Sequence, residues 1–307
     1  MIRIAMIGAG GIARSHADAI TQNPDCTLTA VADIDLERAK AMAMPFGAAY
    51  YTDYKEMDTS AFDAVIITLP HFLHCEASVF FLDRGIHVLC EKPMANTVEE
   101  CDAMVAAAKR SSAKLAIGHV QKYYSAARMI RQIIEDKRYG ALTMIRDTRC
   151  KDYLQNRPAW FLSKKMAGGG IAMNLGAHSI DRILTTTGLS VESACGATSN
   201  PVSDHDVETT AHILLTLTGG ISATITLCGT HVPYVHETVF YFTDGVVKID
   251  RDDLYVYENG EFIQTHGDRD LLIKQLAEFI KLIRGEESEI CSPEYGREII
   301  RVLKKIV

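Results

Sequence analysis

Short apolar runs alternate with helical patterns over the first 120 residues of the chain. The runs are short and mostly apolar, which is typical of strands that are buried on both faces of a parallel sheet. They lie at 2–7, 27–32, 48–51, 63–70, 87–90 and 114–120, and helical patterns lie between them up to about 22, at 36–46, at 73–84 and at 97–111. The alternation predicts an α/β domain over residues 1–120 with a doubly wound parallel sheet.

The pattern changes after residue 120, where strands outnumber helices. Helices are expected over 126–137, from the glycines at 168–170 to about 187, and near 270–284 and 294–306. Strand-like runs, separated by turn signals such as Asn259-Gly260, lie at 141–149, 191–198, 206–217, 220–229, 235–243, 245–250 and 253–257. They predict a second domain over residues 121–307, of the α+β class, with a large and mostly antiparallel sheet.

The first apolar run leads into the sequence Gly8-Ala9-Gly10-Gly11-Ile12-Ala13, which has the pattern G-x-G-x-x-A. Gly8 would permit a tight turn, Gly10 would let the backbone approach a pyrophosphate, and Ala13 would let the helix pack closely on the strand. Asp33 follows the second run, where a carboxylate can bind both hydroxyls of an adenosine ribose. The pattern predicts a Rossmann domain that binds NAD in preference to NADP, although Arg38 would soften that preference.

A charged triplet, Glu91-Lys92-Pro93, follows the buried run at 87–90. In an open parallel sheet the ligand crevice lies beyond the carboxyl ends of the strands, so Lys92 would project where cofactor and substrate meet. The alternative is a surface lysine at a strand end. The residues expected to contact the cofactor are Gly8, Gly10, Gly11, Ile12, Asp33, Arg38, Thr68, Leu69, His71, His74, Glu91, Lys92 and Gln121.

A second group of polar residues lies on the expected helix after the three glycines. Asn174, His178 and Asp181 are spaced i, i+4, i+7, so they would share one face of an α-helix. A histidine there could be a general base for a hydroxyl proton at neutral pH. It could equally be an interior histidine that is bonded to a backbone group.

Composition excludes several classes of function. The formal net charge of -7 and the pI near 5.9 give no basic surface for nucleic acid. No apolar stretch reaches the roughly 18 residues that span a bilayer, and the chain opens on a strand-like run, so we expect a cytoplasmic protein. The eight cysteines form no C-x-x-C pair, so we expect reduced thiols and no metal site.

The chain resembles the Gfo/Idh/MocA oxidoreductase family over nearly its whole length. The matching motifs are Gly8-Ala9-Gly10, Asp33 with Glu37-Arg38-Ala39, Glu91-Lys92-Pro93, and the Gly168-Gly169-Gly170 helix with Gly176, His178 and Asp181. The resemblance implies a Rossmann domain followed by an antiparallel α/β domain, NAD(P) as cofactor, and hydride transfer on a sugar, cyclitol or related alcohol. It also implies catalytic roles for Lys92 and His178, a cis peptide before Pro93, and a homodimer or homotetramer formed through the sheet face.

One departure from the family concerns Asn174, where many of its dehydrogenases have an aspartate. An asparagine can hold a substrate oxygen but cannot stabilise an imidazolium by charge, unless Asp181 does so. We expect a dehydrogenase in which His178 exchanges the hydroxyl proton and Lys92 stabilises the oxygen. The alternative is a dinucleotide-sensing or regulatory protein of the same fold, and a scaffold with a vestigial site is a third reading.

The substrate is poorly bounded by the sequence. Loops that should face the crevice are rich in Arg, Lys, His and aromatic residues, which favours an acidic or phosphorylated polyol, although charged loop residues are usually only solvated. The expected substrate contacts are Tyr123, Arg157, Trp160 and Tyr234, with Lys122, Arg149, Lys151, Tyr153, His231 and His236 as further wall residues.

Overall fold

The computed structural model describes residues 1–202, 204–258, 260–267 and 270–307. The chain forms two compact units. The first consists of residues 1–119 and 270–298, and the second of residues 120–269 and 299–307. Residues 270–298 were expected in the second domain, whereas in the structure they pack with the first unit.

The first unit is built on a six-stranded parallel sheet with the strand order β3-β2-β1-β4-β5-β6. This confirms the doubly wound sheet, whose order reverses between β1 and β4. The strands are β1 (Ile2–Ile7), β2 (Cys26–Ala32), β3 (Ala49–Tyr51), β4 (Ala64–Ile67), β5 (His87–Cys90) and β6 (Leu115–Ile117). The helices are α1 (Gly11–Thr21), α2 (Leu36–Ala43), α3 (His74–Leu82) and α4 (Val98–Arg110), with 3₁₀ turns at Met44–Phe46, Tyr54–Glu56, Thr59–Ala61 and His71–Leu73.

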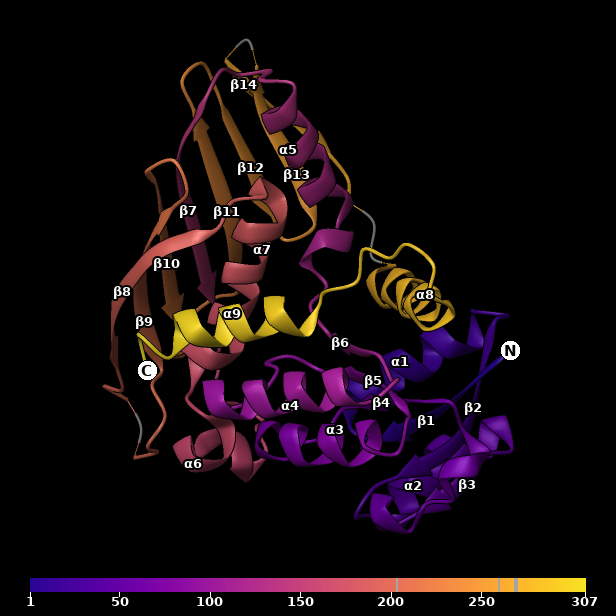
Figure 1. The fold of residues 1–307 in the computed structure, drawn as a ribbon. Helices are drawn as coiled ribbons and strands as arrows, with labels where there is room; N and C mark the ends of the chain where they lie inside the picture. The colour runs from indigo at the N-terminus through magenta and orange to yellow at the C-terminus, as the bar shows by residue number, and fades with distance from the viewer. Residues whose placement is uncertain (203, 259, 268–269) are drawn as a thin grey trace. The chain divides into compact units, whose positions relative to one another are not determined.

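Burial explains why these segments form strands. All four residues of β4 are fully buried, as expected for a central parallel strand covered by helices on both faces. The helices α3 and α4 lie side by side in Figure 1. Thr97 and Glu100 form a capping box at the start of α4.

The helix α8 (Leu271–Arg284) completes the first unit by packing on α1 (Figure 1). Its residues Leu276, Phe279 and Ile280 are buried in the same apolar cluster as Ala13 and Ile20. Burial of these side chains against α1 is the physical reason that 270–298 belongs with the first unit. The last helix, α9 (Pro293–Leu303), begins in the first unit and ends in the second.

The second unit contains an eight-stranded sheet, within the described residues, with the order β14-β13-β12-β11-β7-β10-β9-β8. All neighbours pair antiparallel except β7 and β10, which are parallel. Helices α5 and α7 (Ala177–Thr187) lie against one face of the sheet (Figure 1). The strands are β7 (Leu142–Cys150), β8 (Val191–Ser199), β9 (Thr210–Leu217), β10 (Ile221–Cys228), β11 (Val235–Phe242), β12 (Val246–Asp250), β13 (Asp253–Glu258) and β14 (Glu261–Thr265), and the helix α5 is Ser125–Glu135.

One strand of the second unit differs from the expectations. The strand β14 was not predicted, because all five of its residues are exposed and give no apolar pattern. Asn259 of the expected turn lies outside the described residues. Short elements of the second unit are the 3₁₀ turns Gln121–Tyr123 and Ala159–Leu162 and the helix α6, Lys164–Ala167.

The three glycines do not open one continuous α-helix. Gly168 ends α6 in the left-handed conformation, with φ of 77°. A π-helical turn, Ala172–Gly176, then leads into α7, Ala177–Thr187. Asn174 therefore lies in a π turn, and not in the regular α-helix that was expected to carry both it and His178.

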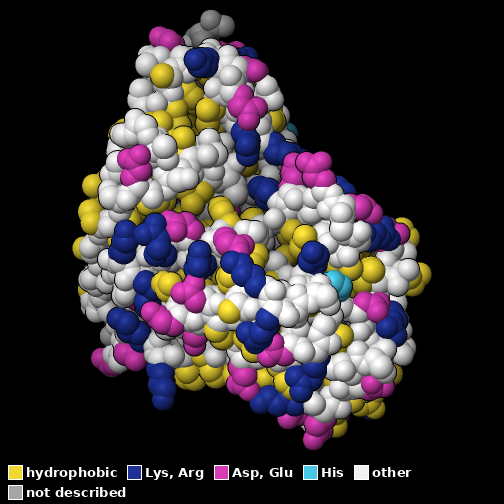
Figure 2. Space-filling view, viewed as in Figure 1, with side chains coloured by type: hydrophobic (Ala, Val, Ile, Leu, Met, Phe, Trp, Pro, Cys, Tyr) yellow, Lys and Arg dark blue, Asp and Glu magenta, His cyan; other side chains and the backbone are white. Residues whose placement is uncertain are grey.

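Charged side chains of both signs are interspersed on the face shown in Figure 2. None of the helices in the described ranges is long and apolar enough to cross a membrane. All eight cysteines lie in the described part of the chain, and each is a free thiol.

Candidate active site

The glycine loop of the first unit has two kinds of glycine. Gly8 has φ of 97°, and a Cβ there would lie 2.9 Å from the carbonyl oxygen of Thr68, so the fold itself requires this glycine. A Cβ at Gly10 or Gly11 would meet no atom within 4 Å. These two glycines therefore leave open backbone at the N-terminus of the 11-residue helix α1, which suits an anionic group.

Asp33 lies directly against this loop. Its Oδ2 accepts a hydrogen bond from the backbone N–H of Ala9 at 2.8 Å, and its Oδ1 accepts from Arg38 at 2.9 Å. The structure thus brings together the glycine turn, the helix N-terminus and the carboxylate that the sequence motif predicted. These residues fit a dinucleotide, because they offer backbone donors for phosphate and an acceptor for ribose hydroxyls. Ile12, also predicted here, is 44% exposed.

The loop after β5 is held by a buried hydrogen bond between Glu91 and His16. Glu91 is 8% exposed, and its Oε1 lies 2.9 Å from Nε2 of the buried His16 on α1. Its Oε2 accepts from the backbone N–H of Lys92 at 3.0 Å. Burial alone would raise the pKa of Glu91, but its hydrogen bond to His16 and the charges of His16 and Lys92 outweigh burial and lower that pKa. The Lys92–Pro93 peptide is cis, as the resemblance implied.

His74 links this loop to the end of β4. It is fully buried, and its ring nitrogens lie 2.9 Å from the carbonyl oxygen of Pro93 and 2.8 Å from that of Leu69. Burial lowers the pKa of His74. Its side chain therefore has no exposed atom for the cofactor contact that we expected, and it positions the two loops. The nearby Thr68 hydroxyl donates to the carbonyl of Gly8 at 2.9 Å, and His71 is 6% exposed.

Gln121 organises the candidate site of the second unit. Its backbone N–H donates to Asp181 at 3.1 Å, and its side-chain oxygen accepts from Nε of Arg182 at 2.7 Å. Its amide nitrogen lies 3.5 Å from Nδ1 of His178. Gln121 was expected among the cofactor contacts, and the structure instead buries it beside His178.

The turn that carries Asn174 is capped by a residue that the sequence did not reveal. Oε1 of Glu208 accepts hydrogen bonds from the backbone N–H groups of Gly170 at 2.7 Å and Ala172 at 3.0 Å. A Cβ at Gly170 would lie 2.1 Å from the carbonyl oxygen of Glu208, so close approach requires glycine there. Asn174 itself is 7% exposed and lies beside the Tyr153 side chain.

Buried polar side chains of the sheet are hydrogen-bonded to one another and to the backbone of α7. Asp147 of β7 is fully buried and accepts from the hydroxyl of Thr238 at 2.7 Å and from Nε of Arg149 at 3.2 Å. Arg149 also donates to the backbone carbonyl of His178 at 3.2 Å. The sheet therefore fixes the backbone that carries His178.

Some of the predicted substrate residues form two groups of contacts, and the others are dispersed. Arg157 donates to the Tyr153 carbonyl at 2.9 Å and stacks on Phe161, which also contacts Trp160. Tyr234 is 57% exposed and contacts His236 through its hydroxyl. The remaining ones are dispersed: Tyr123 is 3% exposed, Lys122 and Lys151 are half-buried, and His231 is an exposed partner of Asp152.

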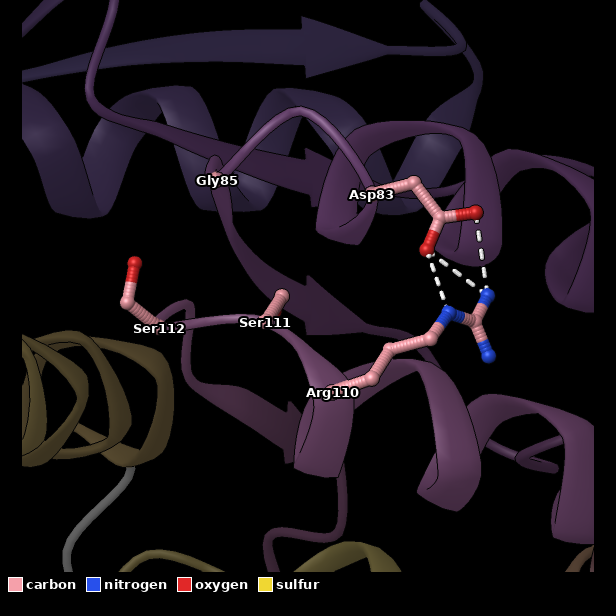
Figure 3. A pocket seen from close by; sticks show the side chains of 5 residues that line it. All are labelled: Asp83, Gly85, Arg110, Ser111 and Ser112. Carbon is pink, nitrogen blue, oxygen red and sulfur yellow. Dashed lines mark hydrogen bonds and ion pairs between the residues drawn. The ribbon is translucent and has the colours of Figure 1, made fainter.

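Figure 3 shows a surface pocket of the first unit. It is lined by Asp83, Gly85, Arg110, Ser111 and Ser112, which precede β5 and β6. In Figure 3 the guanidinium of Arg110 points at the carboxylate of Asp83, with which it forms an ion pair of 2.7 Å. The pocket lies at the amino ends of these strands and contains none of the predicted site residues, so we do not assign the active site to it.

Comparison with known proteins agrees with this arrangement. Residues 2–119 match the model of an oxidoreductase family with an NAD-binding Rossmann fold, and residues 127–248 match the GFO/IDH/MocA C-terminal domain. Glucose-6-phosphate 3-dehydrogenase of Bacillus subtilis (strain 168) is 31% identical over 187 residues, which are 60% of this chain and 53% of that protein. Inositol 2-dehydrogenase of Arthrobacter sp. (strain FB24) is 28% identical over 261 residues, covering 82% and 74%.

The chain spans about half the length of several curated relatives that it matches. Among solved structures, aldose-aldose oxidoreductase from Caulobacter crescentus complexed with glycerol has a TM-score of 0.88 and 23% identity, covering 99% of this chain and 95% of that one. This likeness establishes the fold.

Proposed function

The chain belongs to the GFO/IDH/MocA family of oxidoreductases, and we propose that it is an NAD-dependent dehydrogenase or reductase. Its substrate would be a secondary alcohol or ketone of a sugar, cyclitol or sugar derivative. The first domain would bind the dinucleotide and the second the substrate. The observation that carries the proposal is that buried residues hold the backbone at Lys92 and lie against the ring of His178. Glu91 with His16 holds the Lys92 loop, and Gln121 lies beside the His178 ring.

The two side chains would divide the chemistry. The Lys92 ammonium binds the substrate oxygen and stabilises its developing negative charge. His178 takes the hydroxyl proton in oxidation and returns it in reduction. Bound NAD supplies the hydride acceptor or donor. Asn174 holds a substrate oxygen, and Asp181 positions Gln121 next to His178.

Replacement of Lys92 tests the proposal. Lys92→Ala should lower turnover by a factor of about 100 or more while NAD affinity changes by no more than about twofold, because the ammonium acts in the transition state. Turnover is followed by absorbance of the reduced cofactor with a panel of inositols, hexoses, sugar acids and nucleotide sugars. The control is Lys114→Ala, an exposed lysine before β6. A Lys92→Ala protein with parental turnover would refute the assignment.

Asp33 supports a preference for NAD over NADP. Its carboxylate is placed at the glycine loop by Ala9, where it would repel a 2′-phosphate. Arg38 pairs with it at 2.9 Å and is therefore partly neutralised. A fluorescence titration should show tighter binding of NADH than of NADPH, and the reverse order would overturn this preference.

One observation favours a second function. Asn174 stands where a charged residue would assist His178, so a dinucleotide-sensing protein with little turnover is the competing proposal. Tight NAD binding without turnover on the whole substrate panel would favour it.

We also propose a homodimer or homotetramer. The sheet of the second unit exposes Met144 and Leu214 at about two fifths of their surface, which supports an interface between copies through this face. Light scattering of the intact protein measures the mass directly, and a monomer would contradict this proposal.

A further inference from the structure

A buried guanidinium lies one helical turn after His178. Arg182 on α7 is fully buried, and its Nε donates to Gln121. Neither of its two amino groups has a hydrogen-bond acceptor among the described residues. An arginine carries five N–H donors, and buried donors without acceptors are costly and rare. The four N–H donors of the amino groups therefore point to an acceptor that the protein itself does not supply.

A second unused donor belongs to a residue close enough for the charge of Arg182 to act on it. His236 of β11 is 9% exposed, and its Nε2 has no partner among the described residues. Its Nδ1 lies 3.3 Å from the Tyr234 hydroxyl, which can donate to it and leave the proton on Nε2. Arg149 lies directly opposite His236 in the β7–β11 register, and the Tyr124 ring lies 5.2 Å from the Arg182 guanidinium.

In this cluster the positive charge of Arg182 has no ion pair with a carboxylate among the described residues. Arg149 is paired with Asp147 at 3.2 Å. Burial and the two neighbouring arginines lower the pKa of His236 far below neutrality, so that imidazole is uncharged. Burial and Arg149 lower the pKa of Arg182 to about 10, against smaller opposing effects of Asp147, Tyr124 and Asp252, so Arg182 stays protonated at neutral pH.

We propose that Arg182 and His236 bind a carboxylate of the substrate, which makes the substrate a sugar acid or a carboxylated cyclitol. A single unmatched positive charge suits a monoanion, and the flat guanidinium suits the two oxygens of a carboxylate. The inference rests on the proposed function, because Gln121 joins Arg182 to His178 and Arg149 holds the His178 backbone. A carboxylate bound here would place the sugar ring next to His178.

Calorimetric titration of the intact protein, saturated with NAD, tests the site without requiring turnover. The probes are D-glucuronate, D-glucose and D-glucose 6-phosphate. D-Glucuronate should bind about tenfold or more tightly than D-glucose, because a charge-assisted hydrogen bond in a buried site is worth at least that factor. Equal affinities would overturn the proposal, and tighter binding of the phosphate than of the carboxylate would overturn the assignment to a monoanion.

Variants locate the binding site. Arg182→Met should abolish the preference for D-glucuronate, whereas Arg146→Met should keep it, because Arg146 lies on the same strand as Arg149 but is exposed and paired with Glu237. His236→Phe keeps an aromatic ring at this position and removes the Nε2 donor, so it should lower the preference about threefold or more even if Arg182→Met fails to fold. An undiminished preference in His236→Phe or in folded Arg182→Met would overturn the proposal.

The same experiments separate this inference from the proposed function. Preferred binding of D-glucuronate that depends on Arg182, with no turnover of any sugar, would support the anion site and contradict the dehydrogenase. Turnover of neutral sugars without any carboxylate preference would support the dehydrogenase and contradict the anion site.

Discussion

At the scale of single residues, the buried carboxylate of Glu91 holds the backbone at Lys92. Its carboxylate accepts from the Lys92 backbone and contacts His16. Because an amide at this position would keep the shape but lose the charge, Glu91→Gln isolates the electrostatic part of this contact. We expect it to lower the free energy of unfolding at neutral pH by about 1.5–3 kcal/mol, the range for hydrogen bonds to charged groups.

The pH dependence of that difference follows from the lowered pKa of Glu91. The carboxylate has a lower pKa in the folded protein than its ordinary value of 4.5. Its stabilisation is therefore complete above about pH 4.5 and is lost as the pH falls through the folded-state pKa. Urea unfolding of the parent and Glu91→Gln between pH 3 and 7 should give a gap that closes only at the acid end. A gap independent of pH would contradict this.

Gly8 and Gly10 make a matched pair for the glycine loop. Gly8→Ala should destabilise the first unit by about 1 kcal/mol or more, because alanine is strained at its φ of 97° and would approach the Thr68 carbonyl. Gly10→Ala should leave stability nearly unchanged, since its Cβ meets no protein atom, and should weaken NADH binding. Thermal unfolding and NADH titration of both variants measure the two effects. Equal stability losses would contradict the distinction.

At the scale of elements, buried strands were predictable and the π turn was not. The run that became β4 is uniformly apolar and those that became β1 and β5 are nearly so, because most residues of these strands are buried. The π turn at Ala172–Gly176 leaves no mark in an apolar pattern that suits an α-helix equally well. β14 was missed for the opposite reason, since a strand with no buried face has no hydrophobic alternation.

Glu208 is the residue on which the π turn depends most directly. Its Oε1 accepts from both Gly170 and Ala172, so Glu208→Ala would leave two buried N–H groups without an acceptor. The expected loss is about 2–4 kcal/mol in the free energy of unfolding, from the cost of unsatisfied buried donors. Glu208→Gln keeps an oxygen at that place and should lose less than half as much. Guanidinium unfolding compares the two, and equal losses would refute the capping role.

At the scale of the whole molecule, the sequence indicates the candidate chemical groups but not the residues that hold them. Lys92, His178 and Asp33 stand in short motifs whose meaning is local. Their partners come from distant segments: His16 lies 75 residues from Glu91, and Gln121 lies 61 residues from Arg182. Without knowledge of which elements pack together, no spacing rule in the chain connects such pairs.

The division of the chain into units yields a prediction that distinguishes the observed boundary from the boundary expected from the sequence. Phe279 of α8 is fully buried in the cluster of the first unit, so Phe279→Ala should cost about 3–5 kcal/mol there. Hydrogen exchange should then show faster exchange of the amides in β1 and β2, with β9 and β10 unaffected. The control Phe262→Ala changes an aromatic residue of β14 that is 50% exposed. If the domain boundary lay at residue 120, Phe279 would belong to the second domain. Faster exchange confined to β9 and β10 would therefore contradict the observed division and favour that boundary.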